Sequence, residues 1–471
     1  MSHLNLQDSL FLGLESKARP FHIAGLALCT LPEGASPTFL RDLAQRLRAL
    51  PTTLPVFGTK LSNPGLPINQ RWIDADDYDP DYHILHYALP RPGGLDDLIT
   101  LLSRAHERLL DRDRPLWELH LIEGLEDRRF ALYCKFHHAM VDGVGALRLV
   151  GRLFSETPGE RFGERFGERF GERFGERSQA TPAPRPGSKP RAGAAGLLRQ
   201  FDRMSGELQK QGRAVSELAG MLGTMSRRSL LQREESPPIP FTAPRTLFNQ
   251  DITPQRRIII TELPLDSVRK IGAAVGGTVN DALIAICGGA IRDYLLQHDA
   301  LPSKSLFAGI PVSVEPSGQH KGNQLSTMIC PFGTDLADPM ARLRRIVHVT
   351  QLAKQDLRKL SSPASQDYMN LLLLPALAFT LAGAATRIPP PFNAILSNVP
   401  GASKPLYLDG ATVDTMYPLS LITDALGLNI TVLSYRNQLC MGIVACPSFL
   451  PDIDALSAQV QLAFRAYRKL A

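Results

Sequence analysis

The sequence predicts an α/β protein built as two halves joined by a linker. Its 471 residues exceed what one ordinary core encloses, since domains usually have about 100 to 200 residues. Patterns typical of strands and helices occur before and after a low-complexity segment near the middle of the chain. We therefore predict an N-terminal half at residues 1–155, a linker at 156–244 and a C-terminal half at 245–471.

The N-terminal half combines both kinds of element. The run FALYCKF is apolar on both faces, as expected for a buried strand, and a turn at Gly124 to Asp127 precedes it. Apolar residues at helical spacing indicate helices on either side of this strand pair. The predicted helices are 41–50, 95–110 and 143–154, and the predicted strands are 117–123 and 129–137.

The C-terminal half shows the same mixture. Its clearest feature is NITVLSYRNQLCMGIVA, which predicts a hairpin with Arg436 and Asn437 at the turn. We predict strands at 257–264, 305–314, 393–397, 427–435 and 438–445, and helices at 278–296 and 453–470.

The linker has three parts. Residues 159–177 repeat the tetrapeptide GERF, in which a glycine at every fourth position disfavours a stable helix. Residues 181–190 are rich in proline and continue the linker. Residues 196–231 predict one long helix with an apolar stripe and a basic opposite side. Packing across both halves is favoured for this helix over binding to an anionic membrane surface.

Residues 369–386 carry no charge, and their length is at the lower limit for a membrane span. Asn370, Pro375 and Gly383 interrupt this stretch. A buried helix is therefore the favoured interpretation. A helix that dips into a membrane surface or lines an apolar tunnel comes second, and a true span comes last.

The charge and the cysteine content of the sequence limit which cellular location and which binding partners we expect. The formal net charge of +6 arises mostly at 178–235, where ten Lys or Arg and five Asp or Glu leave a net of +5. No aromatic or arginine-rich pattern accompanies this charge, so nucleic acid is not an expected partner. Residues 1–13 lack the pattern of a secretory signal. The six cysteines form no CxxC pair, so we expect neither a metal site nor a disulfide framework. This cysteine pattern fits a protein located in the reducing cytoplasm.

The segment His137-His138-Ala139-Met140-Val141-Asp142-Gly143 carries the candidate chemistry. A histidine at the end of a buried strand is held in one orientation, and neutral imidazole can take a proton from a hydroxyl or an amine. Asp142 stands where the chain turns into a helix, and Gly143 permits a tight turn. A lone histidine would more often be a packed core residue, but this context favours a general base at His138.

The segment HHAMVDG resembles the HHxxxDG motif of the CoA-dependent acyltransferase superfamily, which includes chloramphenicol acetyltransferase and condensation domains. Further segments resemble motifs of bacterial wax ester synthase/diacylglycerol acyltransferases, in the order of that family. These are Pro115-Leu116-Trp117, Asn280-Asp281, Pro311 to Val314, Gly322 to Gln324, Ser397 to Gly401 and Pro405 to Leu408. The resemblance covers nearly the whole chain except about 155–240.

The resemblance implies a two-domain fold like that of chloramphenicol acetyltransferase, with mixed sheets and a tunnel between the halves. Long-chain acyl-CoA would enter from one side, and a fatty alcohol or diacylglycerol from the other. His138 would deprotonate the hydroxyl, while His137 and Asp142 would hold it in place. No metal and no cofactor is expected, because acyl-CoA is a substrate.

Other residues receive roles through the same resemblance. Asn280 is the candidate donor to the oxyanion, and the equally weighted alternative is that it caps a helix, since asparagine is a preferred N-cap residue. Candidate substrate-binding residues are Gly143, Ser397 and Asn398. Structural roles are expected for Pro115, Leu116, Trp117 and Asp281.

Four features depart from the family pattern. Glu315 stands where arginine is frequent, and Phe21 to Gly25 reads FHIAG instead of MHIGG. Cys446 replaces a frequent aspartate, and the GERF repeat is not a family feature.

Two alternatives to wax ester and triacylglycerol synthesis for storage lipid stay open. One is a condensation-type enzyme with an amine acceptor, and the other is a non-catalytic lipid-body protein. The expected location is the cytoplasm, with peripheral association with the inner membrane or with lipid bodies.

Overall fold

The structure is a computed structural model, and it describes most of the chain. Described are residues 4, 6–64, 70–141, 143–162, 235–313, 325–360 and 383–470, with single residues within 220–227 and 364–380.

The first half is built on a six-stranded sheet in the order β11-β12-β1-β6-β5-β4. Its strands β4 and β5 pair in parallel and all the other neighbours are antiparallel, so the sheet is mixed. The strand bounds are β1 His22–Thr30, β4 Ile84–Gly93, β5 Trp117–Leu125, β6 Arg129–His137, β11 Tyr407–Leu408 and β12 Ala411–Leu419.

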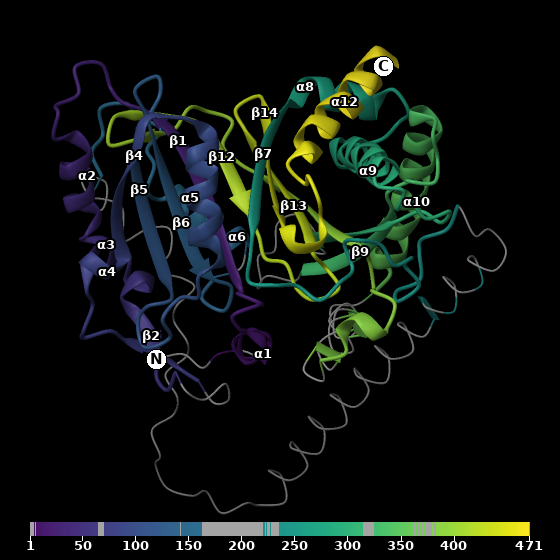
Figure 1. Cartoon of the computed structure of the whole chain (residues 1–471), viewed down its shortest axis with the longest axis horizontal. Helices are drawn as coiled ribbons and strands as arrows, with labels where there is room; N and C mark the ends of the chain where they lie inside the picture. Colours follow the sequence, from purple (N-terminus) through teal and green to yellow (C-terminus); the bar gives the residue numbers. More distant parts are fainter. Residues whose placement is uncertain are drawn as a thin grey trace, which may run out of the picture.

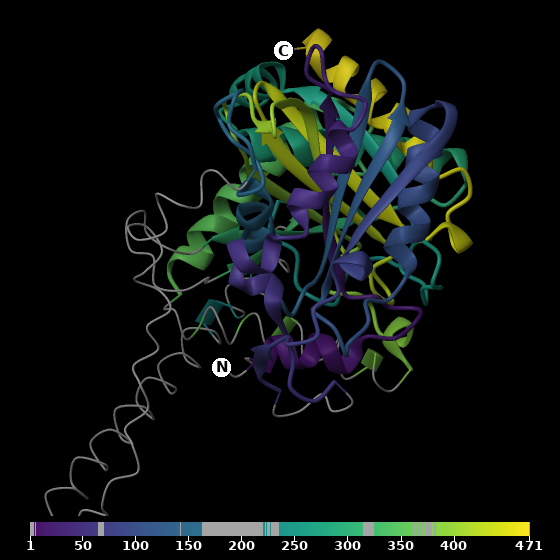
Figure 2. The ribbon, with the colours of Figure 1, turned by 90° about the vertical axis from the view of Figure 1, so that its left-hand side faces the viewer.

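Helices cover both faces of this sheet (Figures 1 and 2). On one face Phe39 of α2 packs against Phe130 of β6. On the other face α5 lies between the sheet and β7 of the second half, where Ser103 accepts a hydrogen bond from the Ile258 amide at 3.1 Å. The helices of this half are α1 Leu6–Leu14, α2 Phe39–Leu47, α3 Leu50–Thr53, η1 Pro55–Gly58, α4 Pro80–His83, α5 Leu95–Glu107 and α6 Gly143–Gly151, and a small sheet pairs β2 Thr59–Leu61 with β3 Trp72–Asp74.

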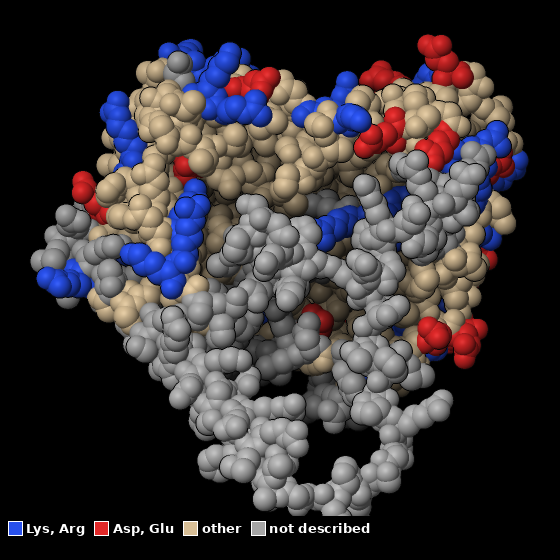
Figure 3. Space-filling view, turned by 180° about the vertical axis from the view of Figure 1, so that it is seen from behind, with Lys and Arg blue, Asp and Glu red and all other residues tan. Residues whose placement is uncertain are grey.

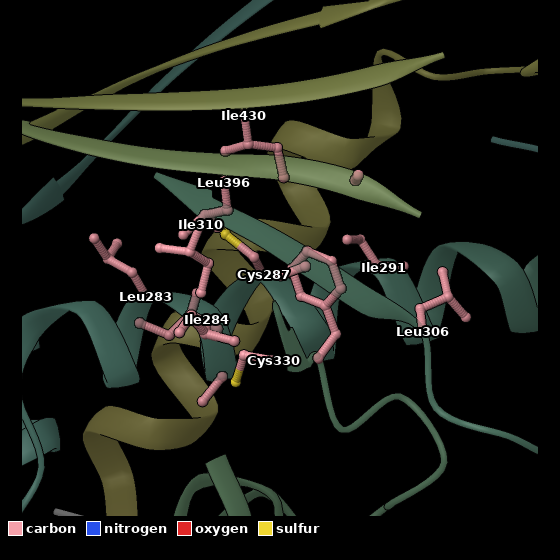
Figure 4. Packing of buried hydrophobic residues seen from close by; sticks show 14 of the residues in the cluster. Leu283, Ile284, Cys287, Ile291, Leu306, Ile310, Cys330, Leu396 and Ile430 are labelled. Carbon is pink, nitrogen blue, oxygen red and sulfur yellow. The ribbon is translucent and has the colours of Figure 1, made fainter. Parts of the chain in front are cut away.

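The second half is built on another mixed sheet, in the order β7-β14-β13-β10-β8-β9. Helices α8, α9, α10 and α12 lie on one side of it (Figure 1), and Figure 4 shows Leu283 and Cys287 of α9 packed below Leu396 and Ile430 of the sheet. The bounds are β7 Arg257–Pro264, α8 Leu265–Ala273, α9 Val279–Gln297, β8 Phe307–Ser313, β9 Leu325–Pro331, α10 Pro339–Arg358, η3 Ala385–Arg387, β10 Ala394–Pro400, β13 Leu428–Tyr435, β14 Gln438–Ala445, η4 Pro447–Phe449 and α12 Ala455–Leu470.

Strand β12 joins the two halves. It follows β10 of the second sheet in the chain, yet it pairs along its length with β1 of the first sheet. Its far side meets the second sheet so closely that a Cβ at Gly442 would lie 2.0 Å from the Pro418 carbonyl oxygen. A division into two successive halves therefore does not describe the sheets, because residues 407–419 complete the first one.

The predicted elements are found at or near their predicted bounds. The predicted helix 41–50 is divided into α2 and α3, and the strands 129–137, 257–264 and 438–445 are confirmed residue for residue. Arg436 adopts φ 54° at the predicted hairpin turn, as a tight two-residue turn requires. The GERF repeat, most of the helix expected at 196–231, Glu315 and most of the apolar stretch 369–386 lie outside the described residues. Within the described part of the chain, no helix has the length and apolar character needed to cross a bilayer.

Candidate active site

The candidate motif begins where β6 ends. Because β6 lies between β1 and β5, its last residue His137 is fully buried, and in the antiparallel register it stands opposite His22 of β1. The chain then turns at His138 to Met140, with a hydrogen bond from the Met140 amide to the His137 carbonyl oxygen at 2.9 Å. Helix α6 starts at Gly143, and Asp142 lies outside the described residues.

His137 is held on three sides. Its Nδ1 accepts a hydrogen bond from the Ala139 amide at 3.0 Å, so the ring proton sits on Nε2. That Nε2 lies 3.3 Å from Oε1 of Glu15. The backbone amide of His137 donates to the Leu116 carbonyl oxygen at 3.0 Å. His137 therefore fixes the turn on which the next residue is carried.

Glu15 is the buried carboxylate at the centre of this arrangement, with a side chain that is 2 % exposed. Arg112 donates to its Oε2 from Nε at 3.1 Å and from Nη2 at 3.0 Å, and the Phe21 amide donates to its Oε1 at 3.2 Å. Burial by itself raises the pKa of Glu15, but the contacts with His137, Arg112 and the Phe21 amide outweigh it and hold the pKa below its usual value. Glu15 is therefore an anion in the folded protein.

His138 differs from its neighbour in exposure. Its backbone amide is tied to the Phe21 carbonyl oxygen at 2.8 Å, but the residue is only partly buried. The ring of Phe11 from α1 packs against its imidazole at a centroid distance of 4.8 Å. The motif thus pairs one locked histidine with one that lies partly open.

The Pro115-Leu116-Trp117 segment is buried and supports the motif. Leu116 packs with Ala139 in a small apolar cluster, in addition to its backbone bond with His137. The Trp117 indole donates to the Phe57 carbonyl oxygen at 2.9 Å and stacks on His83 at 4.5 Å. The segment therefore packs directly beneath the motif, and its structural role stays a prediction.

Behind the motif, the face of the first sheet that α5 covers carries a buried polar network. Nδ1 of His106 on α5 is hydrogen-bonded to the Tyr133 hydroxyl at 2.7 Å, and Nζ of Lys135 lies 2.9 Å from Oε2 of Glu118. Burial, reinforced by the charge of Lys135, lowers the pKa of His106 to about 3. For Glu118 burial raises the pKa, but the hydrogen bond with His120 and the charge of Lys135 lower it to about 2. The network therefore holds His106 neutral and Glu118 charged.

A second group of predicted residues meets in the second half. Asn398 of β10 donates from Nδ2 to Oδ1 of Asn280 at 2.5 Å, which leaves the amide donor of Asn280 for another partner. Thr278, and not Asn280, is the N-cap of α9, because its side chain and that of Asp281 form a reciprocal capping box. The interpretation of Asn280 as a cap residue is therefore wrong.

Asp281 is buried beside Thr278 and Thr350. Its buried carboxylate accepts hydrogen bonds from the amide and hydroxyl of Thr278 at 2.8 and 2.7 Å, and from the Thr350 hydroxyl of α10 at 2.6 Å. Ser397 stands in β10 next to Asn398 and is partly buried. Oδ1 of Asn398 is buried and has no hydrogen-bond partner among the described residues.

The structure contains a small, partly open pocket that no motif residue lines. It lies in the second half against β9 and α10, and its lining includes Met328, Leu357 and Tyr368. The tunnel expected between the halves stays a prediction. Within the described residues, no group of three His, Cys, Asp or Glu side chains is placed to hold a metal ion.

The sequence interpretation missed three residues that contact the motif, namely Phe11, Glu15 and Phe21, and it missed Arg112, which contacts Glu15. A weak signal exists for Glu15, since it follows the apolar run Leu10 to Leu14 and a carboxylate there is unusual unless it is paired. In the sequence, Phe21 stands out only as a departure from a family pattern. In the structure, it makes backbone bonds to both Glu15 and His138.

Family models match most of the chain. The model of the wax ester synthase/diacylglycerol acyltransferase catalytic domain matches residues 4–283, and the model of the C-terminal domain of the same family matches residues 321–468.

Relatives are similar in sequence to this chain over nearly its whole length. A probable diacylglycerol O-acyltransferase of Mycobacterium tuberculosis is 36% identical over 461 residues, which cover 97% of both chains. The O-acyltransferase WSD of Acinetobacter baylyi is 33% identical and covers 98% of this chain and 96% of its own.

Two solved structures show the same architecture. The wax ester synthase/diacylglycerol acyltransferase from Marinobacter aquaeolei superimposes with a TM-score of 0.75 at 32% identity, over 100% of this chain and 99% of that one. A starter condensation domain of rhizomide synthetase gives a TM-score of 0.55 at 15% identity, over 99% of this chain and 93% of that one, a likeness of fold alone.

The buried network predicts an acid-sensitive fold. Folded His106 has a pKa near 3 while the unfolded residue has one near 6.5, so the unfolded state binds more protons between these values. The stability that depends on neutral His106 is complete above pH 6.5 and is lost as the pH falls toward 3. We expect His106→Gln to reduce the slope of unfolding free energy against pH in this window by up to about 1 kcal/mol per pH unit.

Urea unfolding at a series of pH values from 7 to 4 measures this slope. His348→Gln, at an exposed site on α10, is the matched control and should leave the slope unchanged. Equal slopes for wild type and His106→Gln would show that His106 does not cause the acid sensitivity.

Proposed function

The chain belongs to the wax ester synthase/diacylglycerol acyltransferase family and is an O-acyltransferase, and we propose His138 as its general base. The proposed reaction moves a long-chain acyl group from acyl-CoA to the hydroxyl of a fatty alcohol or a diacylglycerol. Its products are a wax ester or a triacylglycerol for lipid storage.

The observation that carries the role of His138 is the contrast between the two histidines. His137 is fully buried, and both of its ring nitrogens face protein groups. His138 is anchored through its backbone, and the residue is only partly buried. A general base must reach the proton that it removes, which only the second histidine can do.

The proposed reaction has two steps. His138 removes the proton from the acceptor hydroxyl while the oxygen attacks the carbonyl carbon of the thioester. The resulting tetrahedral intermediate then collapses, the carbon–sulfur bond breaks, and the protonated imidazole donates its proton to the departing thiolate. The two proton transfers balance, so His138 returns to its starting form.

Asn280 is the proposed donor to the oxyanion. It lies in the first turn of α9, where the positive end of the helix dipole favours negative charge. Because Thr278 caps the helix and Asn398 donates to Oδ1 of Asn280, the Nδ2 donor is not used by the cap or by this bond. Asn398, Ser397 and Gly143 are proposed to line the substrate site, and the buried Oδ1 of Asn398 offers an acceptor there.

Two other functions predict different assay results. A condensation-type enzyme would acylate an amine, and a non-catalytic lipid-body protein would release no CoA at all. The family match favours the oxygen acceptor over both.

We predict graded losses in an assay with purified protein, a long-chain acyl-CoA and either hexadecanol or a diacylglycerol. His138→Ala removes the base and should lower kcat by about 100- to 10,000-fold. Asn280→Ala should lower kcat by about 100-fold or more with little change in KM, because an oxyanion donor acts mainly in the transition state. Ester formation and CoA release are both measured.

His348→Ala is the control and should retain wild-type rates, since it is exposed on α10. Full activity of His138→Ala would remove the assigned base. Unchanged kcat in Asn280→Ala would remove the assigned donor and leave the base in place. Acylation of hexadecylamine in preference to hexadecanol would favour the condensation-type alternative.

We also propose peripheral association with a membrane or lipid-body surface. Two large apolar side chains within the stretch 369–386 are exposed, namely Leu371 at 37 % and Phe379 at 38 %. Figure 3 shows Lys and Arg side chains in several separate groups on one face, and the basic segment 178–235 would add to the attraction for anionic lipid.

Flotation with vesicles tests this proposal. We expect binding to phosphatidylglycerol vesicles that weakens with salt, and weaker binding by Leu371→Glu and Phe379→Glu. Leu296→Glu, at an exposed leucine at the far end of α9, should bind as the wild type does. Absent binding, or equal loss in all three variants, would contradict the proposed surface.

A further inference from the structure

The N-terminal helix α1 brings an aromatic ring to the proposed base. Phe11 packs against the His138 imidazole in a T-shaped contact with an interplanar angle of 61°. Phe11 also stacks on Phe21, with ring centroids 5.5 Å apart. Since the Phe21 carbonyl oxygen accepts the His138 amide, one residue holds both the ring of Phe11 and the backbone of His138.

Helix α1 is itself fixed to the motif. Leu12 is buried in the cluster that contains Leu116 and Ala139, and its carbonyl oxygen accepts a hydrogen bond from Arg112 at 2.5 Å. Glu15 follows Phe11 by four residues, a spacing that places two side chains on the same side of a helical turn. The carboxylate that holds His137 and the ring that meets His138 are therefore supplied by one short segment.

We propose that Phe11 is a positioning residue, which orients the His138 imidazole and keeps water away from it. This inference rests on the proposed function of His138. Water competes with the alcohol because it can also lose a proton to the imidazole and attack the thioester carbonyl. That reaction breaks the same carbon–sulfur bond, but it yields a free fatty acid and CoA in place of an ester and CoA.

The geometry accounts for both parts of the role. An imidazole on a turn can rotate about its side-chain bonds, and a ring at 4.8 Å restricts that rotation. The same ring occupies one side of the imidazole, where an apolar surface excludes water. Because Phe11 is proposed to act through His138, the effect should appear in kcat and in the choice of acceptor.

Three variants at Phe11 test the proposal in the full-length protein. We expect Phe11→Ala to lower kcat for ester formation by about tenfold or more with less than about threefold change in KM for palmitoyl-CoA. The share of CoA released without ester should rise at the same time. Phe11→Leu, which keeps apolar volume without the ring, should lie between Phe11→Ala and wild type, and Phe11→Tyr should retain near wild-type rates.

Phe39→Ala is the matched control. Phe39 is also partly buried, and its ring makes a T-shaped contact with the ring of Phe130. Phe130 lies at the end of β6 that is far from His137. Phe39→Ala should lose stability in urea unfolding without a change in the ratio of fatty acid to ester.

An unchanged ratio and kcat in Phe11→Ala and Phe11→Leu would overturn the proposal, as would equal changes in Phe11→Ala and Phe39→Ala. If Phe11→Ala does not fold, the ratio in Phe11→Leu decides. Failure of the proposed function gives a different result. In that case His138→Ala keeps full ester formation, whereas failure of the Phe11 proposal alone leaves the loss in His138→Ala intact.

Discussion

The buried carboxylate of Glu15 is the interaction on which the candidate site depends. A carboxylate with a side chain only 2 % exposed is costly unless its charge is balanced and its oxygens are hydrogen-bonded. Arg112 provides the balancing charge, the Phe21 amide donates to the other oxygen, and Nε2 of His137 lies 3.3 Å from that oxygen. The position of His137 therefore follows from the position of Glu15, and the turn that carries His138 follows from His137.

The same short segment also ties the motif to the second half. The carbonyl oxygen of Ala18 accepts a hydrogen bond from Arg256 at 2.8 Å, and Arg19 forms an ion pair with Asp424 at 2.5 Å. Arg256 is buried, and burial lowers its pKa to about 10. Residues 15–19 thus contact the motif on one side and the second half on the other. Since β12 also joins the halves, the proposed base and the proposed oxyanion donor are held by one connected framework.

Local patterns in the sequence predicted the elements but not their partners. Strand β6 and the hairpin of β13 and β14 were predicted because apolar runs and turn residues act over a few positions. The pairing of Glu15 with Arg112 joins residues 97 positions apart, and the pairing of β1 with β12 joins segments still further apart, so neither leaves a local signal. At the start of α9 the sequence suggested Asn280 as a cap, and only the geometry shows that Thr278 takes this role.

A double-mutant cycle between Glu15 and Arg112 tests most directly whether the buried carboxylate holds the site. Glu15→Gln, Arg112→Gln and the double variant are compared with wild type in unfolding free energy and in kcat. We expect Arg112→Gln to cost about 3 kcal/mol, because it leaves the buried Glu15 carboxylate without its charge partner, and Glu15→Gln to cost less, because Arg112 is 29 % exposed. The coupling energy between the two changes should be about 1 to 3 kcal/mol. The exposed pair Arg257 and Asp454 serves as the control, with a coupling below about 1 kcal/mol. Additive effects at Glu15 and Arg112, with kcat unchanged in every variant, would contradict the account.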